Sequence, residues 1–372
     1  MVQRIKTSQE FNQFIAVNAQ NPNLGNDILS MRLACYEAIE KLRERPLLIY
    51  ASKFINALPN TPNNIDISDI DGFTDLVQSV RGKSKSVDVL LHSPGGQPDA
   101  TERIVHILRN DFEEVHFIVP HSAYSAATML ALSGDSITLH PSATLGPIDP
   151  QINGTPARSI KRGFEKVKEI IKIEGPEALP AYIPLIEKYS LDLLEICEDS
   201  EKLSRELVSN WITDFMLKGK EKHEGQVKDS VEYFSDYDTH LLHSRPLVIS
   251  KLKKFDLNIS SIHRPIDGVD LGGICSHKWL FWFDSFCEAI RKQIWRFMGD
   301  TISTNLSSTT TARTAAKTSV IKAITIVLRQ KSSPAGNSTY KKLAVQCSAD
   351  AFVVNQTSVL RISFVVKIAN FL

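Results

Sequence analysis

The stretch VDVLLHSPGGQPDATERIVHILRNDFEEVHFIVPHSAYSAATMLALSGDSITLHPSATLGPIDPQ, residues 87–151, decides the fold of this chain. It contains two short aliphatic and β-branched runs, VDVLLH (87–92) and VHFIVP (115–120), each bounded by residues that favour turns. Between them, PDATERIVHILRN (98–110) has apolar residues at helical spacing. A strand, a helix and a second strand in this order form a βαβ unit, so the sequence predicts an α/β fold with a parallel sheet.

Each predicted strand leads into a segment that has the chemistry of half a hydrolase site. After the first strand, Gly95 and Gly96 let the backbone adopt positive φ and leave amide N–H groups unshielded by side chains. After the second strand, Ser125 stands at the start of an Ala-rich helix, near the positive end of that helix. The first segment could stabilise an oxyanion, and the second could supply a nucleophile. A plain turn and an ordinary helix N-cap are the structural alternatives.

Three segments of this stretch, LLHSPGG, VPHSAYSAATMLALSGDSI and HPSATLGPIDPQ, resemble the ClpP/crotonase superfamily. Within it they are similar to the branch that holds signal peptide peptidase SppA, the NfeD-associated proteases and the serine dehydrogenase proteinase (SDH)-type serine peptidases. Weaker similarity runs from about residue 45 to about residue 262. The resemblance implies an α/β fold of the ClpP/crotonase type, a repeated ββα spiral, with helical C-terminal additions.

The resemblance also implies roles for individual residues. Ser125 would be the nucleophile, and Gly95 and Gly96 would supply the oxyanion hole. The substrate cleft would be shaped by three further residues, namely Ala126, Gly146 and Pro147. No metal-ligand pattern emerges from the sequence, and we expect no cofactor.

A serine hydroxyl also needs a proton acceptor within hydrogen-bond reach. ClpP uses a histidine whose position falls near Ile148 here, whereas SppA and the NfeD-associated proteases use a desolvated lysine. The predicted helix SIKRGFEKVKEIIK offers Lys161, Lys166 and Lys168. Lys161 and Lys168 flank its apolar stripe, and the distance from Ser125 in the NfeD-associated pattern points to Lys166. We therefore take Lys166 as the first choice for the base and Lys161 as the second, with solvated surface lysines as the structural alternative.

Histidines near the nucleophile are further candidates for the base. His121 lies four residues before Ser125, His140 closes the next strand, and His92 precedes the two glycines. Most lone histidines are structural residues held by hydrogen bonds. For the two histidines of HLLHSR (240–245), we expect a role in packing or in substrate binding.

The composition is that of an ordinary soluble protein. The chain has 372 residues, a formal net charge of +1 and 42% hydrophobic residues. Its five cysteines are scattered without a CxxC motif, which indicates reduced thiols and a cytoplasmic location. We expect neither a signal peptide nor a stretch of about twenty apolar residues that could span a bilayer, although peripheral membrane association is left open.

The chain divides into three predicted parts: a peptidase domain with a helical cap (1–262), an aromatic helical extension (263–300) and a Ser/Thr-rich basic tail (301–372). Within the first part, further helices are expected at 28–43, 70–80, 159–173, 179–216, 226–234 and 246–255, and further strands at 46–51 and 257–262. The runs AITIVL and ISFVVKIANFL could be strands of the tail. The tail carries no nucleic-acid-binding motif, and we expect no nucleic acid partner.

These observations predict an ATP-independent serine peptidase that acts on peptides or unfolded protein segments. The superfamily assembles into rings or trimers of dimers, so the resemblance implies a homo-oligomer. A crotonase-like acyl-CoA enzyme, with an acidic residue in place of the serine, is the first alternative. A catalytically inactive oligomeric scaffold is the second.

Overall fold

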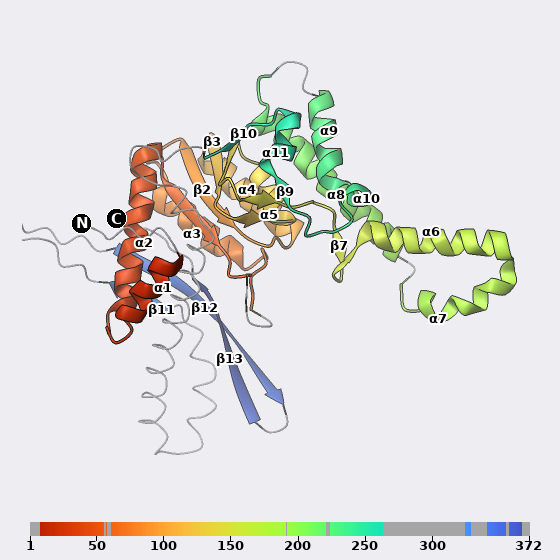
Figure 1. Ribbon diagram of the computed structural model, residues 1–372, viewed down its shortest axis with the longest axis horizontal. Coiled ribbons are helices and arrows are strands. Elements are labelled where there is room, and N and C mark those ends of the chain that lie inside the picture. Colours follow the sequence, from red (N-terminus) through yellow and green to blue (C-terminus); the bar gives the residue numbers. More distant parts are fainter. Residues whose placement is uncertain are drawn as a thin grey trace, which may run out of the picture.

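A five-stranded parallel sheet forms the centre of the molecule (Figure 1). The computed structural model describes residues 8–262, with gaps at 56, 58–60, 191 and 221–223, and the segments 324–328, 341–354 and 357–366. The strand order is β1-β2-β3-β5-β10, with β1 at Leu47–Ala51, β2 at Ser86–His92, β3 at Glu114–Val119, β5 at Ser136–Leu139 and β10 at Ile259–Ser261. The α/β class predicted from the sequence is confirmed.

The register of the sheet aligns apolar side chains into continuous rows. Val89 of β2 pairs with Leu48 of β1 and with Phe117 of β3, and Phe117 pairs in turn with Ile137 of β5. All four side chains are buried and belong to the main core. Because a sheet covered on both faces needs apolar residues at nearly every position, strands such as VDVLL read as continuous hydrophobic runs.

Helices cover the sheet and connect its strands. The helices of the first half are α1 at Ser8–Val17, α2 at Leu24–Arg43, α3 at Asp69–Val80, α4 at Pro98–Asp111 and α5 at Ala126–Leu132. Those that follow are α6 at Ala157–Glu174, α7 at Ile183–Ile186, α8 at Leu193–Trp211, α9 at Glu224–Ser235, α10 at Tyr237–His240 and α11 at Ile249–Leu252. Every residue of α5 is buried, so α5 is the central helix of the fold.

A second, smaller sheet lies beside the first, and two of its strands come directly after strands of the first sheet in the chain. It has the order β4-β6-β9, with β4 at Ser122–Ala123, β6 at Thr144–Leu145 and β9 at Leu247–Val248. Ser93, just after β2, forms a parallel bridge with Ala123. The segments that follow β2 and β3 are therefore joined by backbone hydrogen bonds.

Two helices expected from the sequence are shorter than predicted. The interval 179–216 holds a 3₁₀ turn, Pro176–Ala181, followed by α7 and α8, because Pro180 and Pro184 cannot donate the hydrogen bonds of a continuous helix. The interval 246–255 begins with β9, which pairs antiparallel with β6, so only α11 and a 3₁₀ turn remain helical. In both places, tertiary pairing and proline chemistry override the helical spacing of the apolar residues.

Helices α6 and α7 extend from the body of the molecule as an arm (Figure 1). Only Ala157 and Ile160, at the start of α6, are buried. Farther along, Ile173 and Leu185 expose 83% and 54% of their surface. The arm is thus attached at its base and presents apolar side chains to its surroundings.

The C-terminal part contributes three described strands. They are β11 at Ile324–Leu328, β12 at Lys341–Val354 and β13 at Thr357–Val366, and they form an antiparallel sheet. The runs AITIVL and ISFVVKIANFL, expected from the sequence as possible strands, overlap β11 and β13. The predicted aromatic extension, 263–300, lies outside the described residues, and the three-part division of the chain stays a prediction.

A buried ion pair ties α2 to the central sheet. Asp88 on β2 exposes 1% of its side chain and accepts hydrogen bonds from Nε and Nη2 of Arg43 at 2.9 and 2.8 Å. These hydrogen bonds raise the pKa of Arg43 above its usual value. Arg45 lies 3.5 Å from the same carboxylate. The pair therefore compensates a carboxylate that would otherwise be buried without a counter-charge.

We predict that Arg43→Met lowers the free energy of unfolding by about 3 kcal/mol, because it leaves the Asp88 carboxylate buried and only partly compensated by Arg45. Arg81→Met is the matched control, since Arg81 also forms a two-point pair, with Asp111, but exposes 62% of its side chain. Exposed pairs contribute little, so the control should unfold like the wild type. Urea denaturation measures both variants, and equal losses would contradict the role given to Asp88.

Candidate active site

Ser125 occupies a sharp turn between a strand and a helix. It follows β4 by one residue, after Tyr124, and is the N-cap residue of α5, with φ 52° and ψ −125°. A residue with a side chain rarely adopts positive φ, and such a conformation costs on the order of 1–3 kcal/mol. The residue is half-buried, whereas the helix that follows it is fully buried. Ser125 thus stands at the boundary between the core and the surface, on a strand-turn-helix of the kind that carries the nucleophile in known serine hydrolases.

Gly95 lies directly against this turn. A β-carbon built on Gly95 would stand 2.7 Å from Cβ of Ser125 and 2.4 Å from the carbonyl oxygen of Tyr124. Gly95 also has φ +99°, in the region that glycine tolerates best. Only glycine fits this position, and the structure brings together the two segments that the sequence singled out.

The N–H group of Gly96 faces away from Ile65. Ile65 donates to Gly95 O at 2.7 Å and accepts from Gln97 N at 2.8 Å, so it occupies one side of the backbone around Gly96. In a parallel bridge of this kind, the N–H and C=O of the middle residue face the opposite side. Residues 122–126 lie next to the two glycines' segment, because Ser93 is joined to Ser122 and Tyr124 by backbone hydrogen bonds and the β-carbon position of Gly95 contacts residues 124–126.

A second N–H group lies at the same place. The β-carbon position of Gly95 is 2.9 Å from the backbone nitrogen of Ala126, which is the first residue of α5 and has no intrahelical acceptor for its N–H. The N–H of Gly95 itself donates to Oγ of Ser93 at 3.2 Å. The arrangement therefore offers Gly96 and Ala126 as oxyanion donors, while Gly95 permits the close approach.

Asp149 and His243 form a pair that was not predicted from the sequence. Oδ1 of Asp149 is 2.9 Å from Nδ1 of His243. Asp149 exposes 3% of its surface, and its Oδ2 is buried without a hydrogen-bond partner among the described residues. An imidazole that donates Nδ1–H to a carboxylate keeps the lone pair on Nε2, which is the form a general base requires.

Short stretches of chain connect Asp149 and His243 to segments that contact the turn at Ser125 or its neighbours. Asp149 follows Gly146 by three residues, and a β-carbon at Gly146 would lie 2.6 Å from the ring of Tyr124, the residue before the nucleophile. His243 precedes β9, whose Leu247 pairs with Leu145 of β6. The two residues are 94 positions apart in the chain, so no local sequence signal could have joined them.

The base of the arm contacts the segment that carries this histidine. Arg158 Nε and Arg162 Nη1, both on α6, lie 2.9 and 3.0 Å from the carboxylate of Asp238. Asp238 belongs to α10, which ends three residues before His243. These ion pairs join α6 to the polypeptide immediately before the histidine.

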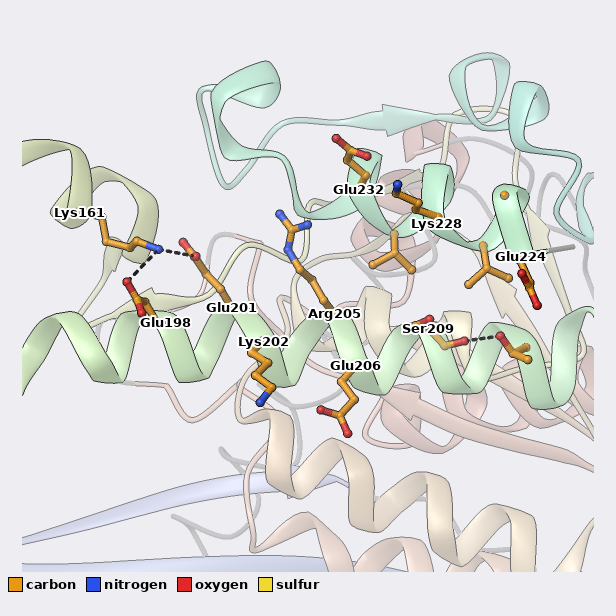
Figure 2. Close-up of a pocket in the computed structure, with 14 residues that line it drawn as sticks. Lys161, Glu198, Glu201, Lys202, Arg205, Glu206, Ser209, Glu224, Lys228 and Glu232 are labelled. Carbon is orange, nitrogen blue, oxygen red and sulfur yellow. Dashed lines mark hydrogen bonds and ion pairs between the residues drawn. The ribbon is translucent and has the colours of Figure 1, made fainter. Parts of the chain in front are cut away.

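The two lysines predicted as the base both lie on α6. Lys166 is exposed on α6, which runs away from the sheet (Figure 1). Nζ of Lys161 lies 3.1 Å from Glu201 and 3.7 Å from Glu198, both on α8 (Figure 2). An amine acts as a base only through a free lone pair, so Lys161 would have to leave these carboxylates. The lysine base stays a prediction.

The other histidines make structural contacts. His92 is buried, with Nδ1 3.1 Å from the carbonyl oxygen of Ser122, and it stacks on Phe54 at 4.7 Å between ring centroids. His121 Nδ1 lies 2.6 Å from Oγ of Ser122, and His140 Nδ1 lies 2.7 Å from a neighbouring serine hydroxyl. These contacts agree with the structural reading given to lone histidines.

The residues predicted to shape the cleft are buried. Ala126 and Gly146 pack against the turn at Ser125, and Pro147 is buried beside Gly146. They fix the backbone around the nucleophile, and their contact with substrate stays a prediction.

A groove of about 1380 Å³ lies between α8 and α9 (Figure 2). Its walls carry charges of both signs, including Arg205 and Glu206 from α8 and Lys228 from α9. Lys161, the second choice for the base, lines the groove, whereas Ser125, Gly95 and Gly96 do not.

Within the described part of the chain, no group of three or more His, Cys, Asp or Glu side chains is placed to hold a metal ion. None of the helices in the described ranges is long and apolar enough to cross a lipid bilayer.

Two uncharacterized proteins of Methanocaldococcus jannaschii are similar to the chain. One is 26% identical over 194 residues, covering 52% of this chain and 59% of the relative, and the other is 36% identical over 99 residues, covering 26% and 35%. The chain thus spans about six-tenths and about one third of the lengths of these relatives.

A solved structure and a family model also match. The catalytic domain of the ClpP protease from Plasmodium falciparum aligns with a TM-score of 0.34 and 14% identity, covering 61% of this chain and 90% of that one. Residues 63–264, more than half of the chain, match the model of a protease family. The chain therefore belongs to the family of ClpP-like SDH-type serine proteinases.

Proposed function

We propose that the chain is a serine peptidase that hydrolyses peptide bonds in peptides or unfolded protein segments without ATP. The observation that carries the proposal is the contact between the strained turn at Ser125 and the backbone of Gly95. A serine on such a turn, with the N–H group of Ala126 at the same contact, supports acyl transfer, because that reaction requires a nucleophile next to oxyanion donors. Membership of a serine proteinase family supports the same reaction.

In the proposed reaction, His243 is the general base. Nε2 of His243 accepts the proton of the Ser125 hydroxyl while Oγ bonds to the scissile carbonyl carbon. The N–H groups of Gly96 and Ala126 stabilise the oxyanion. The C–N bond then breaks, and the imidazolium returns the proton to the leaving amine. Water repeats these steps on the acyl-enzyme, releasing the acid and restoring the serine.

Two observations favour His243 over the lysines as the base. The carboxylate of Asp149 holds one ring nitrogen of His243, which fixes the tautomer, as in other serine hydrolases. By contrast, Lys166 is exposed and Lys161 is paired with Glu201.

A fluorophosphonate probe tests the proposal, because it reacts only with activated serines. We expect the wild type to be labelled and Ser125→Ala to remain unlabelled. His243→Gln and Asp149→Asn should lower the labelling rate by about 10³- to 10⁴-fold, since removal of one triad member has effects of this size. Lys161→Ala and Lys166→Ala should label within about twofold of the wild type.

The controls separate chemistry from folding. Thermal unfolding of each variant identifies those that lose labelling through instability. Labelling of Ser125→Ala at the wild-type rate would overturn the proposal, and thioesterase activity on acyl-CoA that survives this substitution would favour the crotonase-like alternative. Loss of labelling in a lysine variant, with His243→Gln unaffected, would assign the base to that lysine.

The close approach at Gly95 gives an independent prediction. Gly95→Ala should abolish labelling, because its β-carbon would overlap the backbone of Tyr124 and displace Ser125. Gly154→Ala is the matched control: Gly154 also has positive φ, +80°, but no atom lies within 4 Å of its added β-carbon.

The control should cost about 1 kcal/mol of stability from backbone strain alone and leave the labelling rate unchanged. Urea denaturation and labelling of both variants distinguish strain from overlap. If Gly95→Ala behaved like the control, the contact with the nucleophile would have no role in catalysis.

A further inference from the structure

We infer that Thr128 is a positioning residue whose hydroxyl fixes the nucleophile relative to the substrate cleft. This inference rests on the proposed function, since it assigns a residue to the same reaction. Thr128 lies on α5, three residues after Ser125, and is fully buried. It does not touch the reacting atoms and acts through the backbone on either side of them.

The hydroxyl of Thr128 forms two hydrogen bonds with different segments. Oγ1 donates to the carbonyl oxygen of Ala123 on β4 at 2.7 Å. The same oxygen accepts from the backbone N–H of Gly146, just after β6, at 3.0 Å. One side chain thus connects the nucleophile's helix, the strand before it and the segment that leads to Asp149.

The bond to Ala123 closes a loop around Ser125. Its acceptor precedes Ser125 by two residues, and its donor follows by three. A threonine inside a helix usually bonds to a carbonyl three or four residues back, within the same helix. Thr128 instead reaches five residues back, past the helix start, so its hydroxyl holds both ends of the turn that contains the positive φ.

This connection explains how the strained turn persists. A backbone conformation that costs free energy remains populated only when its surroundings over-determine it. At Ser125 the surroundings include the backbone of Gly95 and the bond from Thr128 to Ala123. Removal of the hydroxyl deletes the one side-chain bond that spans the turn from Thr128 to Ala123.

The bond from Gly146 sets the position of the cleft segment. The N–H of Gly146 is shared between Oγ1 of Thr128 and the carbonyl oxygen of Ala123, which lies 3.0 Å away. Gly146 also packs against Tyr124 without room for a side chain. The segment that continues to Asp149 is therefore held at a fixed distance from the nucleophile.

The substitution Thr128→Val tests this role with little change in shape, because valine replaces the hydroxyl with a methyl group. Gly146 keeps its bond to Ala123, so no buried N–H loses its last partner and the variant should fold. We expect its maximal rate of fluorophosphonate inactivation to fall at least tenfold, with the probe's half-saturating concentration unchanged, since small displacements of reacting groups can cost on the order of 10²-fold in rate.

Two variants serve as controls. Thr128→Ser keeps the hydroxyl and should label within about threefold of the wild type, so it separates the hydrogen bonds from the packing of the methyl group. Thr213→Val removes a helical Thr bond of similar length, 2.8 Å to Ser209, away from the site and should label like the wild type.

The outcomes for this inference and for the proposed function are distinct. If the wild type is labelled and Thr128→Val is labelled equally fast, Thr128 has no positioning role, while the peptidase proposal stands. If the wild type is not labelled at all, the proposed function fails, and hydrogen exchange decides on Thr128. Faster amide exchange at 122–128 and 144–147 in Thr128→Val than in Thr213→Val supports the positioning role of Thr128, and unchanged exchange overturns it.

Discussion

The close backbone contact between Gly95 and the turn at Ser125 is the constraint on which the candidate site depends. The carbonyl of Tyr124 and the β-carbon of Ser125 occupy the space that any side chain at position 95 would need. This contact brings the backbone nitrogen of Ala126 within 2.9 Å of the β-carbon position of Gly95. The parallel sheet makes it available, because β2 and β3 are neighbours and their carboxyl ends emerge at the same edge.

The sequence was sufficient to predict the central part of this arrangement. The runs at 87–92 and 115–120 are apolar at almost every position, as buried parallel strands require, and they fall within a residue of β2 and β3. Turn chemistry then identified Gly95 and Ser125, because only certain residues tolerate the backbone that follows such strands. These signals are local, so a single sequence carries them in full.

The rest depends on contacts between distant parts of the chain. Asp149 and His243 meet across 94 residues, and neither stands in a pattern that names its partner. The lysines illustrate the opposite case: helical spacing placed Lys161 beside an apolar stripe but could not show that Glu198 and Glu201 of α8 would engage it. Periodicity also failed at 246–255, where pairing with β6 replaces the first turn of the predicted helix.

The arm formed by α6 and α7 is joined by ion pairs to α10, the helix just before the loop that carries His243. Arg158 and Arg162 of α6 bind the same carboxylate, that of Asp238 on α10. A displacement of the arm is therefore transmitted to α10. These pairs are solvent-accessible and weaken as salt rises, whereas the bond between Asp149 and His243 is shielded. Rising ionic strength therefore weakens the attachment of the arm to α10 and leaves the pair of Asp149 and His243 in place.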